Sequence, residues 1–213
     1  MQKIILFDLD GTLIDSTEAI LHCFFSSFEK FGYKKPSEDE IKDLIGHPLE
    51  YMYEHLGVSK DEVDEFVKAY KTCYRPISKP KTKLLPNALE AIKLASTHAR
   101  LGVVTTKTAL YSKELLEHME VMNYFEVLVG REDVTNPKPH KEPIELALKK
   151  MGIETYHDDI WMIGDTPMDL LCAKNAGINS VAVLCGYGKK EELEKHTSHI
   201  YHDSLEAVKT ILQ

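Results

Sequence analysis

The 213-residue sequence has no apolar run approaching the roughly 18 residues of a membrane-spanning helix, so we expect no membrane span. Its start has no basic segment followed by a cleavage site, which favours a cytoplasmic protein. The four cysteines form no CxxC pair and no zinc-like spacing, which indicates free thiols in a reducing compartment. Acidic residues outnumber basic ones, and the resulting net charge of −8 argues against non-specific nucleic-acid binding.

The remaining composition is that of a globular protein, with 43% hydrophobic and 28% charged residues. Its length suits one α/β domain with a sizeable insertion, or two small domains. Strand-like apolar runs occur at residues 4–9, 101–105, 125–129, 160–163 and 181–184. Helical patterns lie between most of these runs, which predicts a doubly wound parallel sheet built from residues 1–14 and 84–213.

Residues 15–83 interrupt this alternation and contain no convincing strand. We expect an inserted all-helical unit joined to the core by two short linkers, which together make a natural hinge. The expected helices cover residues 18–31, a short stretch from Pro48 to His55, and a longer stretch that ends near Tyr74. Four aromatic residues at helical spacing predict the core of this unit and its contact with the sheet domain: Phe24, Phe25, Phe28 and Phe31.

Local signals within the insertion predict where its helices begin and end. Ser37-x-x-Glu40 and Ser59-x-x-Glu62 both have the pattern of a capping box. Residues 75–81 are rich in Pro and Lys, and we expect no regular structure there.

The first strand-like run ends in Asp8-Leu9-Asp10-Gly11-Thr12. Side chains two residues apart on a strand point the same way, so Asp8 and Asp10 face the same side. Carboxylates that close repel one another unless a cation neutralises them. Gly11 permits a sharp turn directly after the pair. The segment therefore predicts a metal site at the carboxyl edge of a parallel sheet.

Two later segments place polar groups at the same predicted edge. Thr105 ends the second run, where its hydroxyl and the next backbone N–H suit a phosphate oxygen; a Thr capping the following helix is the common alternative. Lys138 lies between two prolines, which lowers the entropic cost of holding its ammonium against a phosphate and a carboxylate. Its alternative is a solvated loop lysine.

A further pair of acids follows the run at 160–163. Asp165 is expected at the strand end and Asp169 in the first helical turn, and their hard oxygen ligands suit Mg²⁺. Alternatively, Asp165 or Thr166 caps the helix and Asp169 complements its dipole. Six residues thus gather at one sheet edge in a set suited to phosphoryl transfer to a carboxylate: Asp8, Asp10, Thr105, Lys138, Asp165 and Asp169.

These segments, in this order, resemble the motifs of the haloacid dehalogenase superfamily of phosphohydrolases. The insertion at 15–83 resembles the C1-type cap of that superfamily. Within it, the chain is most similar to the phosphoglycolate phosphatase and pyrophosphatase group, with beta-phosphoglucomutase as a near relative. The resemblance implies a haloacid-dehalogenase-like core with a helical cap that selects the substrate.

The resemblance also implies residue roles. Asp8 is the nucleophile that forms an aspartyl-phosphate, and Asp10 protonates the leaving oxygen and then activates water. Mg²⁺ is held by an Asp8 oxygen, the Asp10 backbone carbonyl and Asp165, with Asp169 acting through water. The phosphoryl group is held by Thr105, the Thr106 backbone N–H and Lys138.

The sequence departs from the superfamily pattern at two places. The loop reads Lys138-Pro139-His140-Lys141 where Lys-Pro-x-Pro is usual, and Thr106 stands where many relatives carry Asn. In the cap, His47 is a candidate for substrate contact, although loop histidines more often face water. Arg75 and Lys79 are candidates for attracting an anionic substrate, with solvated linker charges as the alternative.

The sequence thus predicts a Mg²⁺-dependent phosphomonoester hydrolase that acts on a small phosphorylated metabolite, as a monomer or homodimer. Phosphoglycolate, pyrophosphate, nucleoside monophosphates and sugar phosphates all remain open as substrates. A phosphosugar mutase would keep every core residue. Asp10 disfavours a haloacid dehalogenase, whose first motif normally lacks the second acid. The insertion disfavours a phospho-acceptor signalling domain of the receiver type, which has no helical unit after its first strand.

Overall fold

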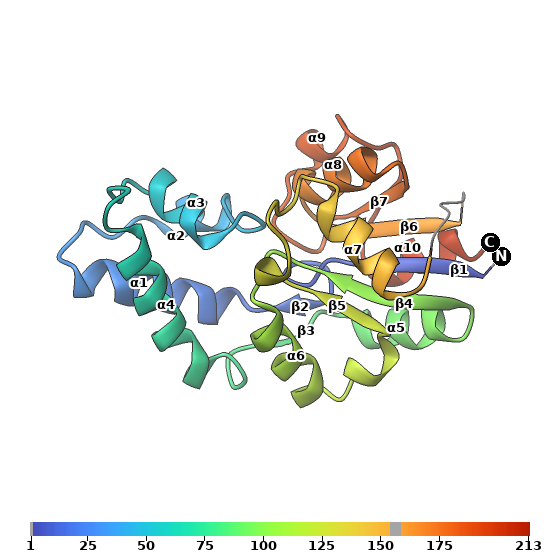
Figure 1. The fold of residues 1–213 in the computed structure, drawn as a ribbon, viewed down its shortest axis with the longest axis horizontal. Coiled ribbons are helices and arrows are strands. Elements are labelled where there is room, and N and C mark those ends of the chain that lie inside the picture. The colour runs from blue at the N-terminus through green and yellow to red at the C-terminus, as the bar shows by residue number, and fades with distance from the viewer. Residues whose placement is uncertain (1, 154–158) are drawn as a thin grey trace.

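The computed structural model describes residues 2–153 and 159–213 and contains a parallel sheet flanked by helices, with a helical unit beside it (Figure 1). The strand order is β5-β4-β1-β6-β7-β8, and all neighbours are parallel. These strands are β1 (Lys3–Phe7), β4 (Ala99–Val104), β5 (Val127–Val129), β6 (Ile160–Gly164), β7 (Asn179–Val183) and β8 (Ile200–Tyr201). The predicted α/β class is confirmed.

Helices cover both faces of the sheet because its central strand is apolar on both sides. Ile5 and Phe7 of β1 pack in one hydrophobic cluster with α5, α6 and α10, whereas Ile4 and Leu6 pack in another with α7 and α8. The helices of this part are α5 (Ala88–Ser96), α6 (Ala109–His118), α7 (Glu142–Lys150), α8 (Pro167–Ala176), α9 (Lys190–Leu193) and α10 (Ser204–Ile211), with 3₁₀ turns at Met122–Tyr124 and Arg131–Asp133.

The register of the central strands fixes which residues share one edge. Phe7 lies beside Val103 of β4 and Ile163 of β6, so the three strands end at nearly the same level. The residues that follow each strand therefore leave the sheet together at its carboxyl edge, which is where open α/β sheets place ligands.

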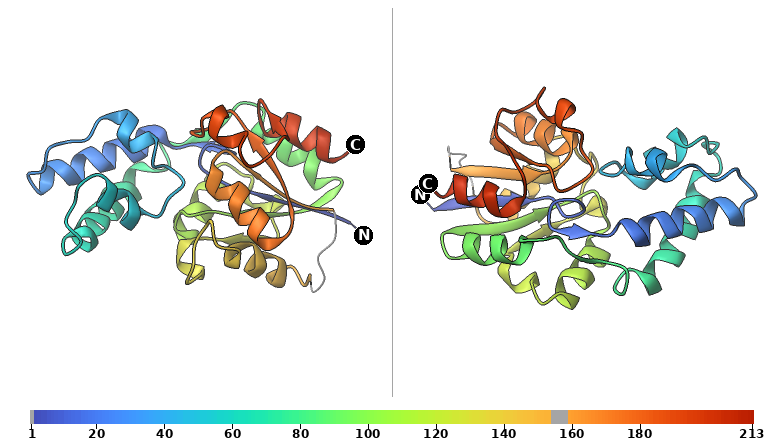
Figure 2. Two further views of the ribbon diagram at one scale, coloured as in Figure 1. Left: turned by 90° about the horizontal axis from the view of Figure 1, so that it is seen from above. Right: turned by 180° about the vertical axis from the view of Figure 1, so that it is seen from behind.

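The helical unit contains α1 (Thr17–Lys30), α2 (Glu38–Lys42), α3 (Leu49–His55) and α4 (Val63–Ile77). It has its own hydrophobic cluster, in which the rings of Phe24, Phe28, Tyr53 and Phe66 pack against one another. Figure 2 shows this unit at the end of the sheet opposite the chain termini. We call it the cap. Within the described ranges, no helix combines the length and apolarity needed to cross a membrane.

Two short strands were missed at the crossings between cap and core. β2 (Ile14–Asp15) pairs antiparallel with β3 (Lys83–Leu84), so the two linkers lie side by side. The expectation that residues 15–83 contain no strand is therefore wrong at both ends of the insertion. Strands of two residues are too short to produce an alternating pattern, and only the pairing of distant segments defines them.

Two local predictions in the cap are also wrong. The Ser37 capping box is present, but α4 begins only at Val63 with Glu62 at its N-cap, so Ser59 does not cap it. Moreover, α4 continues through Pro76 to Ile77 rather than ending near Tyr74. Because Pro76 lies in the last turn, it removes one backbone hydrogen bond without breaking the helix, and the buried Tyr74 anchors that turn against the cap core.

Candidate active site

A cavity lies between the carboxyl edge of the sheet and the cap. Its core wall includes Asp8, Asp10, Thr105, Thr106, Lys107 and Arg131, and its cap wall includes Ile20, Phe24, His47, Met52, Tyr70 and Tyr74. The core wall thus supplies charged and hydroxyl groups, whereas the cap supplies mainly apolar and aromatic surface. This combination is typical of a binding site for a small molecule with one strongly polar end.

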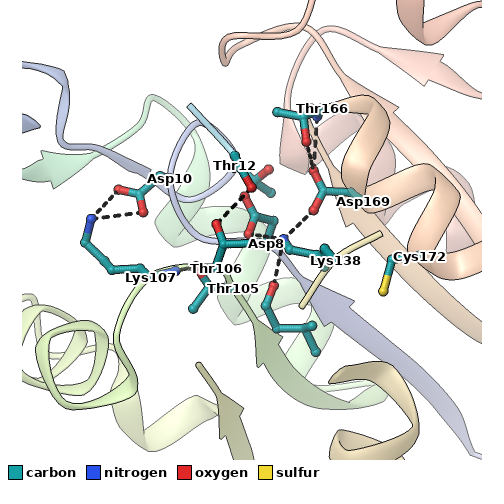
Figure 3. A network of polar contacts seen from close by, with 12 residues as sticks. Asp8, Asp10, Thr12, Thr105, Thr106, Lys107, Lys138, Thr166, Asp169 and Cys172 are labelled. Carbon is teal, nitrogen blue, oxygen red and sulfur yellow. Dashed lines mark hydrogen bonds and ion pairs between the residues drawn. The ribbon is translucent and has the colours of Figure 1, made fainter. Parts of the chain in front are cut away.

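Lys138 is the buried cation at the centre of the site (Figure 3). Its Nζ lies 2.6 Å from Asp8 Oδ1 and 2.5 Å from Asp169 Oδ1, and it donates to the Val104 carbonyl at 3.2 Å. Burial alone would lower the pKa of Lys138, but the charges of Asp169 and Asp8 outweigh it and raise the pKa. Lys138 is therefore a charged, fixed group and not a solvated loop lysine.

Three buried carboxylates cluster beside this ammonium, and two of them, Asp8 and Asp169, contact it. One oxygen from each of Asp8, Asp165 and Asp169 lies within 4.8 Å of the others. Burial raises the pKa of Asp8 to about 7, an effect that Lys138 opposes and Asp169 reinforces. Burial and the charges of Asp8 and Asp169 also raise the pKa of Asp165 well above its ordinary value. Three clustered carboxylates, only two of which are paired with an ammonium, form a donor set that fits a hard divalent cation such as Mg²⁺.

Neighbouring loops hold Asp165 in place. The Thr12 hydroxyl donates to Asp165 Oδ1 at 3.0 Å, and the Tyr187 amide donates to Oδ2 at 2.8 Å. Gly11 has a φ of +87°, and a Cβ added there would overlap the Asp165 carboxylate. The first motif therefore requires glycine both for its turn and for the close approach of Asp165.

Asp169 contacts both the start of α8 and the buried Lys138. Its Oδ2 accepts hydrogen bonds from the Thr166 amide at 3.0 Å and the Thr166 hydroxyl at 2.8 Å, at the first turn of α8. Its other oxygen contacts Lys138. Of the two residues predicted as alternatives for the N-cap of α8, Thr166 occupies that position and Asp165 does not. Asp169 completes a capping box with Thr166, and this box directs its other oxygen toward Lys138.

Asp10 lies apart from the carboxylate cluster. Both of its oxygens lie 3.1 Å from Lys107 Nζ, and the Ser16 hydroxyl also donates to it. The Lys107 ammonium lies 4.7 Å from the centre of the Tyr74 ring in the cap. Burial lowers the pKa of Lys107, but the Asp10 charge, Tyr74 and the hydrogen bonds to both together outweigh burial, so the pKa is raised. Coordination of Mg²⁺ by the Asp10 backbone carbonyl stays a prediction.

Sequence reasoning missed Lys107 as a site residue. The one available signal was its position two residues beyond Thr105, just after the end of a strand whose carboxyl edge was expected to form the site. A lysine at such a loop position is usually solvated, and only the packing of the cap over it makes it a buried ion-pair partner.

The two threonines after β4 serve different contacts. Thr105 Oγ1 accepts from the Lys107 amide at 3.1 Å, which leaves its hydroxyl hydrogen available. Thr105 is not the cap of α6, because that helix begins at Ala109 with Thr108 at its N-cap. The Thr106 hydroxyl donates to the Gly46 carbonyl at 3.0 Å and so links the core to the cap.

The three cap residues considered for substrate contact or attraction lie in different surroundings. His47 lines the cavity with its ring stacked on Tyr51 at 4.3 Å, and burial and His55 lower its pKa. Arg75 lies over the Tyr111 ring, and Lys79 Nζ is 3.7 Å from Glu114. Neither Arg75 nor Lys79 lines the cavity, which favours their interpretation as charges at the junction of cap and core.

Comparison with known proteins agrees with this geometry. The haloacid dehalogenase-like hydrolase family matches residues 5–183. The chain is 32% identical to pyrophosphatase PpaX of Bacillus pumilus over 90% of this chain and 88% of that protein. It is 26% identical to phosphoglycolate phosphatase of Salmonella typhimurium over 94% of this chain and 88% of that protein. A haloacid dehalogenase-like hydrolase from Streptococcus pneumoniae superposes with a TM-score of 0.87 at 28% identity, covering 98% of each chain. The resemblance seen in the motifs is confirmed, and the chain belongs to the haloacid dehalogenase-like hydrolase family.

Proposed function

We propose that the protein is a Mg²⁺-dependent phosphomonoester hydrolase that acts on a small metabolite through an aspartyl-phosphate at Asp8. The observation that carries this proposal is the position of Asp8, which directly follows the central strand, faces the cavity and contacts the buried Lys138 at 2.6 Å. Family relatives named as phosphatases and pyrophosphatases support the same reaction class. A carboxylate held in this way is suited to attack phosphorus.

The residues divide the proposed reaction into two steps. An Asp8 oxygen attacks the phosphorus, the bond between phosphorus and the leaving oxygen breaks, and Asp10 gives that oxygen a proton. Water then attacks the phosphorus of the aspartyl-phosphate, Asp10 takes a proton from that water, and the bond between phosphorus and the Asp8 oxygen breaks. Inorganic phosphate departs and the Asp8 carboxylate is regenerated. Lys138, the Thr105 hydroxyl and the Thr106 backbone N–H bind the phosphoryl oxygens throughout.

Asp8 and Asp165 would hold Mg²⁺, with Asp169 and the Asp10 backbone carbonyl as the further predicted ligands. When bound, the ion supplies Lewis-acid stabilisation of the charge on the phosphoryl group. The Lys138 ammonium against Asp8 partly offsets the repulsion between that carboxylate and an anionic substrate before the substrate enters.

The proposed substrate class is a small phosphate compound of the phosphoglycolate or pyrophosphate type. Pyrophosphatase is favoured as a candidate by the 32% identity to PpaX, which exceeds the 26% identity to phosphoglycolate phosphatase. A phosphosugar mutase remains the alternative that shares every core residue, and a phospho-acceptor domain is the non-enzyme alternative. In either alternative, Asp8 would hold a phosphate that is released as inorganic phosphate only slowly.

The test is phosphate release from a panel of phosphoglycolate, pyrophosphate, nucleoside monophosphates and sugar phosphates, with Mg²⁺ or with EDTA. Wild type should release phosphate only with Mg²⁺, and Asp8→Asn should release none while keeping its circular dichroism spectrum. Lys113→Met, a change of a surface lysine on α6, is the matched control. Phosphate trapped on Asp8 without release would indicate the mutase or phospho-acceptor instead.

A further inference from the structure

We propose that Lys107 binds an anionic group on the leaving group of the substrate and thereby selects substrates whose leaving group carries a carboxylate or a phosphate. The proposal rests on the proposed function, because it assigns the leaving-group side of the same site. It identifies Lys107 as a specificity-determining residue, whereas Lys138 contacts the nucleophile Asp8.

Lys107 is held at a fixed position in the cavity wall. Its amide donates to Thr105 Oγ1 at 3.1 Å, and its carbonyl accepts from the Arg131 amide at 3.0 Å. Its side chain is only 10% exposed and lies against the face of the Tyr74 ring. A lysine whose backbone and stem are both fixed loses little further entropy when its ammonium binds a ligand.

The contact between Lys107 and Asp10 must change during the proposed reaction. Lys107 Nζ is 3.1 Å from both Asp10 oxygens, so Asp10 cannot turn an oxygen to the leaving group without weakening this pair. Asp10 supplies the anionic partner of this ammonium, and the Tyr74 ring of the cap lies against it. A buried ammonium without a partner is costly, and an anionic oxygen on the leaving group would replace the lost contact.

The other charged groups of the cavity also favour an anion close to Lys107. Arg131 lines the same core wall, and its buried Nε has no hydrogen-bond partner among the residues that the structure describes. The facing cap surface is mainly apolar, with Glu50 and Lys71 as its charged members. The core wall thus offers two cations, Lys107 and Arg131, to a carboxylate or phosphate close to the leaving oxygen.

The experiment compares 2-phosphoglycolate with its neutral amide, 2-phosphoglycolamide, which has nearly the same shape. Wild type should prefer the acid by about 10- to 100-fold in kcat/KM, the factor expected for one hydrogen bond between charged groups. Lys107→Met should lose about that factor on the acid and less than about 3-fold on the amide. Lys113→Met on α6 should keep the wild-type preference. Pyrophosphate, assayed alongside, distinguishes a phosphate from a carboxylate as the preferred anion.

Two results would overturn the proposal. Equal kcat/KM values for acid and amide in wild type would show that no leaving-group anion is recognised. Equal losses on both compounds in Lys107→Met would show that Lys107 only positions Asp10. Binding of both compounds to Asp8→Asn, with and without Lys107→Met, gives the same comparison by calorimetry without turnover. An absence of hydrolysis would therefore refute the proposed function, while the binding preference would still decide the role of Lys107.

Discussion

The buried lysine of the site offers the most stringent test of its electrostatics. Lys138→Met keeps most of the side-chain volume but removes the one ammonium that contacts both Asp8 and Asp169. Asp8 and Asp169 would then lose the cation that they share, next to the third buried carboxylate, Asp165. We expect the variant to fold but to be strongly destabilised in the absence of divalent cations, because removing one partner of a buried ion pair leaves uncompensated charge.

The contacts of Lys138 determine how much stability the variant loses and how that loss depends on pH. Breaking a buried pair costs about 3–5 kcal/mol, which is roughly 6–20 °C in Tm for a chain of this size. The pKa of Asp8 is already raised to about 7, and Lys138 is the main influence that lowers it, so the variant should raise it further. The folded state then binds a proton more tightly than the unfolded state, whose Asp has a pKa of about 3.9. The free energy of unfolding of the variant therefore falls as pH rises above about 4. The difference in stability between the variant and wild type is largest above pH 7.

Trp161 on β6 is the single tryptophan, so its fluorescence reports unfolding of the core in urea. Measurements at pH 5 and pH 8, each with EDTA or Mg²⁺, should show the largest deficit at pH 8 with EDTA and partial recovery with Mg²⁺. Lys141→Met is the matched control, since Lys141 forms a surface pair with Glu145 that contributes little. Wild-type stability of Lys138→Met at pH 8 in EDTA would refute the electrostatic reasoning.

Two further predictions concern proton transfer and a helix cap. Asp10→Asn should reduce kcat by about 10²–10⁴ with an unchanged circular dichroism spectrum, and a near-wild-type rate of phosphate release would assign the proton transfer to another group. Asp203 caps α10; burial raises its pKa, but hydrogen bonds from Asn87 and the Glu206 and Leu205 amides outweigh this and lower it. The ionised Asp203 carboxylate should therefore stabilise the fold above about pH 4, and this stabilisation should be lost as pH falls through the pKa of the folded state. Asp203→Ala should lower the free energy of unfolding by about 1 kcal/mol at pH 7 and by almost nothing near pH 2, as measured by urea titration. A cost that stays constant with pH would contradict the role of the carboxylate.

The sequence by itself determined the features that depend on neighbours in the chain. The apolar run before Asp8 predicts a buried strand, and the position of Asp165 after another such run predicts that both acids meet at one edge of the sheet. Lys138 was expected to reach a carboxylate, and its ammonium contacts Asp8. These predictions hold because strand direction in a parallel sheet fixes where the following residues emerge, whatever the details of packing.

Tertiary structure alone decided the contacts between segments far apart in the chain. The pairing of Lys107 with Asp10 joins two distant loops of the core beneath Tyr74 of the cap, and the pairing of β2 with β3 depends on the two linkers meeting. Neither has a local pattern, because a lysine after a strand and a two-residue strand are both common in loops. The sequence therefore specified the end of the site that holds Asp8, the proposed nucleophile, whereas the folded arrangement of cap and core specified the end at Lys107, which is proposed to face the leaving group.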